Sequence, residues 1–202
     1  SLDGYNKQTT RGGHLLPQNM DNKEQVKTFV EVMTDFFVKI NTLGVSDIKY
    51  YSVGEDNHSG DFGYAANMAL INILNLSKLV SSAVVFDKYI DYFTIGKQNF
   101  MLCHGKDQKD VFKGMPLTLN DKTENQINEY LDYIEVTKNV HFIKGDLHQS
   151  ATTYGKRFRY KSVGSFFGSS EWIHKNFGDT KAVCDIDIVS DDEILETRIV
   201  LN

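Results

Sequence analysis

The sequence has little cysteine, little proline and no long apolar run. Its 202 residues include two cysteines, two prolines and one tryptophan. Cys103 and Cys184 lie in apolar stretches without C-x-x-C spacing, which excludes a disulfide-dense secreted domain and indicates buried thiols in a cytoplasmic protein. No apolar run approaches the roughly 20 residues of a membrane-spanning helix, so we expect no membrane insertion. The net charge of −5 also argues against a broad electrostatic clamp on nucleic acid.

The sequence has enough apolar residues to form one sizeable hydrophobic core. Hydrophobic residues make up 41% of the chain and charged residues 24%, and there are 13 Phe and 10 Tyr. These values are close to those of an ordinary soluble globular protein. The length favours a single domain over residues 1–202.

The apolar pattern predicts a chain of mixed secondary structure. Apolar residues at helical spacing predict three helices, over Asn22–Thr42, Tyr64–Val80 and Glu124–Val136. Short apolar runs predict strands at Ile48–Val53, Val84–Phe86, Tyr92–Ile95, Phe100–Cys103, Val140–Ile143, Phe158–Val163, Ala182–Val189 and Ile194–Leu201. We expect Asn22 to cap the first helix and Gly96–Asn99 to form a hairpin turn. Helices alternate with strands early and strands pair locally late, which predicts an α/β layered sandwich with a mixed sheet.

Three short polar motifs each follow a predicted strand directly. They are Gly54-Glu55-Asp56-Asn57-His58, Cys103-His104-Gly105 and Gly145-Asp146-Leu147-His148. The carboxyl ends of sheet strands are where α/β proteins gather their sites. Amide, imidazole and carboxylate ligands together suit Mn²⁺, Fe²⁺ or Zn²⁺. The three motifs therefore predict a divalent metal site.

The order of these motifs resembles a known family. Asn-His, then His-Gly, then Gly-x-x-His is similar to the last three motifs of the calcineurin-like metallophosphoesterases. The likeness is closest to the SbcD-related branch of phage-type DNA exonucleases, in which a Thr-Arg-Gly loop resembles Thr9-Thr10-Arg11-Gly12. The resemblance implies an α-β-β-α sandwich with mixed sheets, and the hydrolysis of phosphate esters between two metal ions.

The resemblance also implies a role for each matching residue. Asn57, His104 and Asp146 would hold one metal ion, and His148 would reach the other. His58 would lie beside the scissile phosphate as the catalytic acid or electrostatic stabiliser. From its own chemistry, Arg11 is a candidate to hold a substrate phosphate through its guanidinium group, and an exposed loop arginine is the alternative interpretation. For Asp146, simple turn chemistry after Gly145 is the alternative interpretation.

Two departures from the family pattern change the expected function. The Asp-x-His and Gly-Asp motifs that the family carries on its first strands do not occur before the Asn57-His58 motif, so we expect the first strand–helix unit to be missing and the metal centre to be incomplete. A shortened sheet would leave an unpaired edge, which predicts a dimer or a partner chain. Asp146 replaces a histidine of the family, and this harder ligand favours Mn²⁺, with Mg²⁺, Fe²⁺ and Zn²⁺ as alternatives.

Two functional hypotheses follow from the resemblance. The first is a metal-dependent phosphoesterase, by origin a phosphodiesterase or DNA exonuclease, that is catalytically incomplete. The alternative is a non-catalytic subunit with a degenerate metal centre that binds a partner or nucleic acid. Outside the motifs, His141 alternates with Ile143 in a predicted strand and is expected to be a hydrogen-bonded core histidine.

Overall fold

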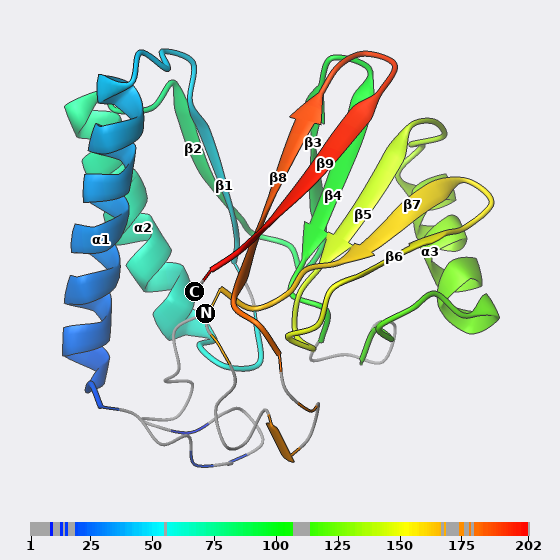
Figure 1. Cartoon of the computed structure of the whole chain (residues 1–202), viewed down its shortest axis with the longest axis horizontal. Helices are drawn as coiled ribbons and strands as arrows, with labels where there is room; N and C mark the ends of the chain where they lie inside the picture. The colour runs from blue at the N-terminus through cyan, green and yellow to red at the C-terminus, as the bar shows by residue number, and fades with distance from the viewer. Residues whose placement is uncertain are drawn as a thin grey trace. The chain divides into compact units, whose positions relative to one another are not determined.

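The chain forms two compact units, which divide between Tyr89 and Ile90. The computed structural model describes residues 9, 13, 15, 19–54, 56–106, 114–166, 168, 174–175, 178 and 180–201. Helices and strands occur in both units, and one sheet contains both parallel and antiparallel pairs (Figure 1). This confirms the predicted α/β class with a mixed sheet. None of the helices in the described ranges has both the length and the apolar character that crossing a membrane requires.

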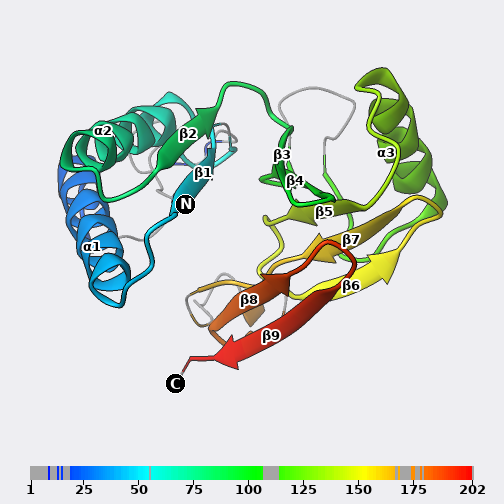
Figure 2. The same cartoon turned by 90° about the horizontal axis from the view of Figure 1, so that it is seen from above.

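The first unit is a parallel strand pair covered by two helices. Its elements are α1 (Asn22–Thr42), β1 (Lys49–Val53), α2 (Asp61–Ser77) and β2 (Ser82–Phe86). Phe37 of α1 packs with Leu70 and Leu74 of α2 in a buried cluster that Ile48 and Val80 complete. Both helices lie on the same side of the β1–β2 pair (Figure 2). The core of this unit therefore lies between its helices and one face of its strands.

The first helix spans the predicted residues, but its cap is Asp21. The Asp21 side chain accepts a hydrogen bond from the backbone N–H of Glu24, and the Glu24 carboxylate accepts one from the backbone N–H of Asp21, both at 2.9 Å. This reciprocal capping box satisfies two backbone donors that the first turn leaves free. The prediction that Asn22 caps the helix is therefore wrong by one residue.

The described part of the second unit contains a five-stranded sheet, the helix α3 and a hairpin. The sheet has the strand order β3-β4-β5-β7-β6. The elements are β3 (Asp91–Ile95), β4 (Gln98–Cys103), α3 (Asp121–Tyr133), β5 (Val140–Lys144), β6 (Ala151–Tyr154), β7 (Phe158–Ser162), β8 (Val183–Val189) and β9 (Ile194–Val200). The strands β4, β5 and β7 run parallel, whereas β3 and β6 are antiparallel to their neighbours.

The two faces of this sheet differ in chemistry. Met101, Phe142 and Tyr160 are cross-strand neighbours with no exposed surface. They lie on the face that α3 covers with Ile127 and Leu131, which are also fully buried (Figure 2). The β8–β9 hairpin lies on the opposite face. Because successive strand residues alternate between faces, the residues between the apolar ones point towards the hairpin.

Two helices and one strand differ most from the prediction. The second and third helices begin and end three residues earlier than expected. The first turn of α3 is polar and gives no apolar signal, whereas that of α2 holds one apolar residue, Phe62, next to Gly63. Asn120 fixes the start of α3 by accepting a hydrogen bond from the backbone N–H of Thr123 at 2.9 Å. Strand β6 was not predicted, because its sequence Ala-Thr-Thr-Tyr has no apolar alternation. It forms by antiparallel pairing with β7.

Candidate metal centre

In the first unit, the loop between β1 and α2 is organised by Asp56. One carboxylate oxygen of Asp56 accepts hydrogen bonds from the backbone N–H groups of His58 and Ser59, each at 2.6 Å. The other oxygen accepts a bond from the Ser59 hydroxyl at 2.5 Å. These bonds stabilise the turn that leads into α2. The Asp56 carboxylate therefore shapes the loop that carries Asn57 and His58.

Asn57 stands out in this loop because its side chain is buried and polar. Only 8% of Asn57 is exposed. Its side-chain oxygen has no hydrogen-bond partner among the residues that the structure describes. A buried polar atom without a partner costs free energy, so such an atom calls for a ligand, a water or an ion. The amide oxygen of Asn57 is thus chemically suited to a hard cation.

In the second unit, two parallel strands deliver His104 and Asp146 to one edge of the sheet. Cys103 at the end of β4 is the register partner of Lys144 at the end of β5. The Nε2 atom of His104 consequently lies 3.5 Å from Oδ1 of Asp146, and both side chains are largely buried. The backbone N–H of Gly145 donates to the carbonyl oxygen of His104 at 2.9 Å, which ties the two loops together.

The backbone of these loops is tightly constrained. Gly105 has a φ of +109°, and a β-carbon there would lie 2.9 Å from Cδ of Lys144 and 3.0 Å from the carbonyl oxygen of Gly145. Asp146 and His148 have φ values of 72° and 56°, in the left-handed region that residues other than glycine seldom adopt. Such conformations are costly and cluster at functional sites.

The local charges keep Asp146 ionised. Burial by itself raises the pKa of the Asp146 carboxyl, but the hydrogen bond and charge of His104 and the positive charges of Lys106 and Lys144 outweigh it and lower the pKa. Burial lowers the pKa of Lys144 to about 8, although the nearby Asp146 carboxylate partly opposes this shift. An ionised carboxylate beside an imidazole offers one oxygen and one nitrogen that could hold a divalent metal ion together.

The sequence-predicted site residues fall into three groups. Asn57 and His58 lie together in the first unit, and His104 and Asp146 lie together in the second. His148 belongs to the loop after β5, and the described residues that could share one ion do not include it. Arg11 lies outside the described residues, as does Glu55.

Sequence reasoning missed one buried charge beside this pair. Lys144 has no exposed surface, and its ammonium group donates to the carbonyl oxygen of Met115 at 3.4 Å. Two features of the sequence could have pointed to Lys144. It stands two residues before Asp146, and it lies on the same strand face as Val140 and Phe142. A lysine at the end of a strand is nevertheless usually exposed, so the sequence alone would not distinguish it.

Comparisons with known proteins give weak structural similarities. No family model matches the sequence, and no curated protein matches it. A single mutant of Vps29 from Entamoeba histolytica is 17% identical, with 82% of this chain and 89% of that chain covered and a TM-score of 0.38. Wild-type Vps29 from the same organism, complexed with Zn²⁺, is 16% identical, with the same coverage and TM-score.

A third solved structure extends the comparison to another organism. Vacuolar Protein Sorting 29 from Cryptosporidium parvum is 8% identical, with 77% of this chain and 98% of that chain covered and a TM-score of 0.38. At these TM-scores the likeness assigns neither a family nor a function to this chain.

Proposed function

We propose that the chain is a divalent-metal-binding subunit of metallophosphoesterase type, whose main role is to assemble with a partner chain. The observation that carries this proposal is the His104–Asp146 pair, 3.5 Å apart at the ends of two adjacent parallel strands. In this proposal the His104 imidazole supplies a nitrogen ligand and the Asp146 carboxylate supplies an oxygen ligand. Mn²⁺ is the preferred ion, because the carboxylate oxygen is a hard ligand.

A binding role is favoured over turnover by the size of the ligand set. Hydrolysis of a phosphate ester between two metal ions needs a ligand set for each ion. The described residues supply His104 and Asp146 for one ion, and His148 is not grouped with them. A single ion can fix the loops after β4 and β5 in one arrangement, and binding energy of this kind stabilises the folded state.

The role in assembly is supported by the outer face of the β8–β9 hairpin. Ile188 and Leu195 are cross-strand neighbours, and each is 62% exposed. Ile186 and Ile199 continue this aliphatic face and are 47% and 41% exposed. Among the described strands, β8 and β9 pair only with each other. A contiguous exposed apolar face on a free strand pair is typical of a protein–protein contact, so we propose a partner protein with an apolar surface.

The second candidate is the phosphodiesterase or DNA exonuclease activity of the resembling family. The observation that favours it is the position of His58, which follows Asn57 in a loop at the carboxyl end of a strand. A histidine beside a metal-bound phosphate can donate a proton to the leaving oxygen. A small phosphodiester such as bis(p-nitrophenyl) phosphate is the direct probe for this activity.

One set of variants separates the two candidates. Electron paramagnetic resonance of added Mn²⁺ counts free ions, and we expect the wild type to take up one ion per chain and Asp146→Asn to take up none. His174→Ala, an exposed histidine outside the loops, is the matched control and should bind like the wild type. Turnover of bis(p-nitrophenyl) phosphate that Asp146→Asn and His58→Ala abolish would establish the enzyme instead. Uptake equal in all variants would reject a metal centre at these residues.

A further inference from the structure

One row of planar side chains crosses the whole five-stranded sheet on its hairpin side. Each member is the register partner of the next, in the order Phe93, Phe100, His141, Arg159 and Tyr154. Phe93 stacks on Phe100 with ring centroids 5.4 Å apart, and Phe100 stacks on the His141 imidazole at 5.1 Å. The row therefore fixes the orientation of His141 by stacking before any ligand is present.

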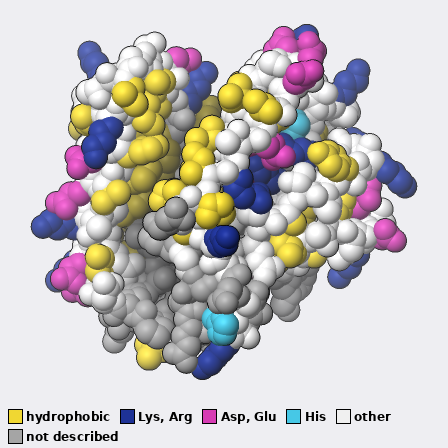
Figure 3. All heavy atoms as spheres, in the orientation of Figure 1, with side chains coloured by type: hydrophobic (Ala, Val, Ile, Leu, Met, Phe, Trp, Pro, Cys, Tyr) yellow, Lys and Arg dark blue, Asp and Glu magenta, His cyan; other side chains and the backbone are white. Residues whose placement is uncertain are grey.

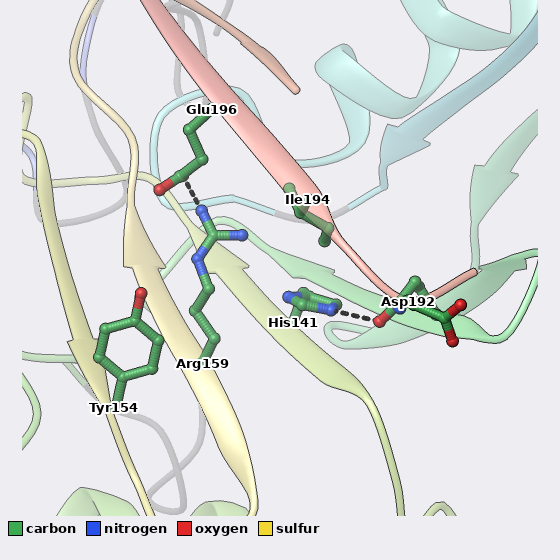
Figure 4. A pocket seen from close by; sticks show the side chains of 7 residues that line it. His141, Tyr154, Arg159, Asp192, Ile194 and Glu196 are labelled. Atoms are coloured by element: carbon green, nitrogen blue, oxygen red, sulfur yellow. Dashed lines mark hydrogen bonds and ion pairs between the residues drawn. The ribbon is translucent and has the colours of Figure 1, made fainter. Parts of the chain in front are cut away.

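A cavity of about 210 Å³ lies where this row meets the turn and strand of the hairpin. The sheet contributes Gln98, His141, Tyr154 and Arg159, and the hairpin contributes Asp192 and Glu196. Figure 4 shows the guanidinium group of Arg159 and the hydroxyl group of Tyr154 directed towards the same side, near Glu196. The metal-centre residues His104 and Asp146 do not line it.

The hydrogen bonds of His141 determine which of its nitrogens can accept. Nε2 of His141 lies 2.9 Å from Oε1 of Gln98, and Nε2 of Gln98 donates to the carbonyl oxygen of Asp191 at 2.7 Å. Oε1 of Gln98 can only accept, so Nε2 of His141 carries the proton. In the neutral ring Nδ1 is then the acceptor, and it has no hydrogen-bond partner among the described residues. Figure 4 shows this second ring nitrogen on the side of Arg159.

Arg159 supplies the complementary donor. Only 8% of Arg159 is exposed, and its Nη2 atom forms an ion pair with a carboxylate oxygen of Glu196. Its Nη1 atom is buried and has no hydrogen-bond partner in the described part of the chain. The same cavity is thus lined by a buried cationic donor and a buried neutral acceptor, and neither atom has a hydrogen-bond partner among the described residues. Leaving both unsatisfied costs free energy that a bound molecule would recover.

The charges around the cavity select the class of that molecule. A simple anion would meet Arg159 but also the carboxylate of Glu196. A simple cation would meet that carboxylate but also the guanidinium of Arg159. A molecule with both charges can place each against its opposite. We propose that the cavity binds a small zwitterionic molecule of the amino-acid class, with its carboxylate on Arg159 and its ammonium group towards Nδ1 of His141 and Glu196.

The volume limits the size of this ligand. The cavity volume of about 210 Å³ is below the roughly 300 Å³ at which pockets for drug-sized ligands start. Serine, alanine and threonine are therefore the amino acids that we select as probes.

Nuclear magnetic resonance of the histidine ring tests the proposal. Serine titrated into the ¹⁵N-labelled chain should shift the Nδ1 resonance of His141 in a saturable manner. Acetate and ethylammonium, which each carry one charge of the zwitterion, should bind at least about tenfold more weakly. No saturable shift with serine, alanine or threonine would overturn the proposal, and so would equal binding of acetate alone.

Two variants and one control tie the binding to these side chains. In calorimetric titration with serine, the affinity should fall at least about tenfold for Arg159→Gln and for His141→Phe. The phenylalanine keeps a ring stacked on Phe100 but removes the acceptor nitrogen. Arg157→Gln changes a partly exposed arginine that pairs with Asp132 outside the cavity, so its affinity should equal that of the wild type. If Arg159→Gln fails to fold, Tyr154→Phe at the exposed rim is the variant to test instead, and we expect a smaller loss of serine affinity for it. Affinity that is unchanged in His141→Phe would reject the assignment.

Discussion

We expect the variant Lys161→Met to lose about 3–5 kcal/mol of unfolding free energy, the usual cost of removing one partner from a buried ion pair. Lys161 is 2% exposed. Its ammonium group lies 2.8 Å from Oε1 of Glu196 and 3.0 Å from Oδ1 of Asp187, with Asp185 at 3.6 Å. Methionine keeps the volume of the side chain but leaves these carboxylates without their shared cation.

This cost arises because the hairpin packs on the sheet through charges. Lys161 and Arg159 belong to β7, and their carboxylate partners belong to β8 and β9. Lys and Arg side chains lie beside Asp and Glu side chains over this part of the second unit (Figure 3). The hairpin presents carboxylates to the sheet and aliphatic side chains to the other side. Loss of Lys161 should therefore affect the hairpin more than the helix-covered face.

Urea unfolding at neutral pH measures the unfolding free energy that Lys161→Met loses, and Lys97→Met is the matched control. Lys97 pairs with Asp191 at 3.3 Å, but its side chain is 64% exposed, so its loss should cost at most about 1 kcal/mol. Hydrogen exchange should also become faster in the β8–β9 amides of Lys161→Met. Equal costs for the two variants, or a cost below about 1 kcal/mol for Lys161→Met, would refute the reasoning.

Three further predictions concern single residues. Burial lowers the pKa of His141 to about 4 from its usual 6.5, so the unfolded chain binds an extra proton between these values. Unfolding free energy should fall as the pH drops from 6.5 to 4, and His141→Phe should remove that slope in urea titrations. Gly105→Ala should cost about 1–3 kcal/mol in thermal unfolding because its φ is +109°, whereas Gly114→Ala, with open space around it, should be nearly neutral. Asp56→Ala should cost about 1 kcal/mol in the same assay, as the loss of a helix cap does, and Asp56→Asn should cost less.

The sequence predicted the elements whose apolar spacing is regular. The helix over Asn22–Thr42 was predicted closely, although with Asn22 as its cap, because its apolar side chains recur every three to four positions. The β3–β4 hairpin was predicted with a turn over Gly96–Asn99, of which Gly96 and Lys97 form the turn and Gln98 and Asn99 begin β4. Gly96 has the positive φ that a tight turn needs. In contrast, the polar first turn of α3 carried no such signal, and neither did β6.

The sequence could not predict which charged side chains are buried. Strand β7, Phe-Arg-Tyr-Lys-Ser, alternates apolar and basic residues, which is the pattern of a strand with one face in water. All five residues are buried, because a hairpin more than 20 residues later brings the carboxylates that pair with Arg159 and Lys161. Such pairing depends on which strands meet, and residue spacing alone does not contain that information.

The candidate site was predictable in part for the same reason. His104 and Asp146 each follow an apolar strand, so their meeting required only that β4 and β5 be parallel neighbours. The turn role of Asp56 and the buried Lys144 depend on local backbone geometry and on packing. The roles of Asn57 and His148 as ligands, of His58 as the catalytic acid, and of Arg11 with substrate stay predictions.

Calorimetric titration of the chain with Mn²⁺, run in parallel on His104→Ala, tests the central claim most directly. The account predicts one binding site in the wild type, with an affinity that falls at least about tenfold in the variant. Zn²⁺ titrated under the same conditions would show how far the oxygen ligands select the ion. Binding that is absent from the wild type, or that is the same in His104→Ala, would contradict the claim that His104 and Asp146 form a metal centre.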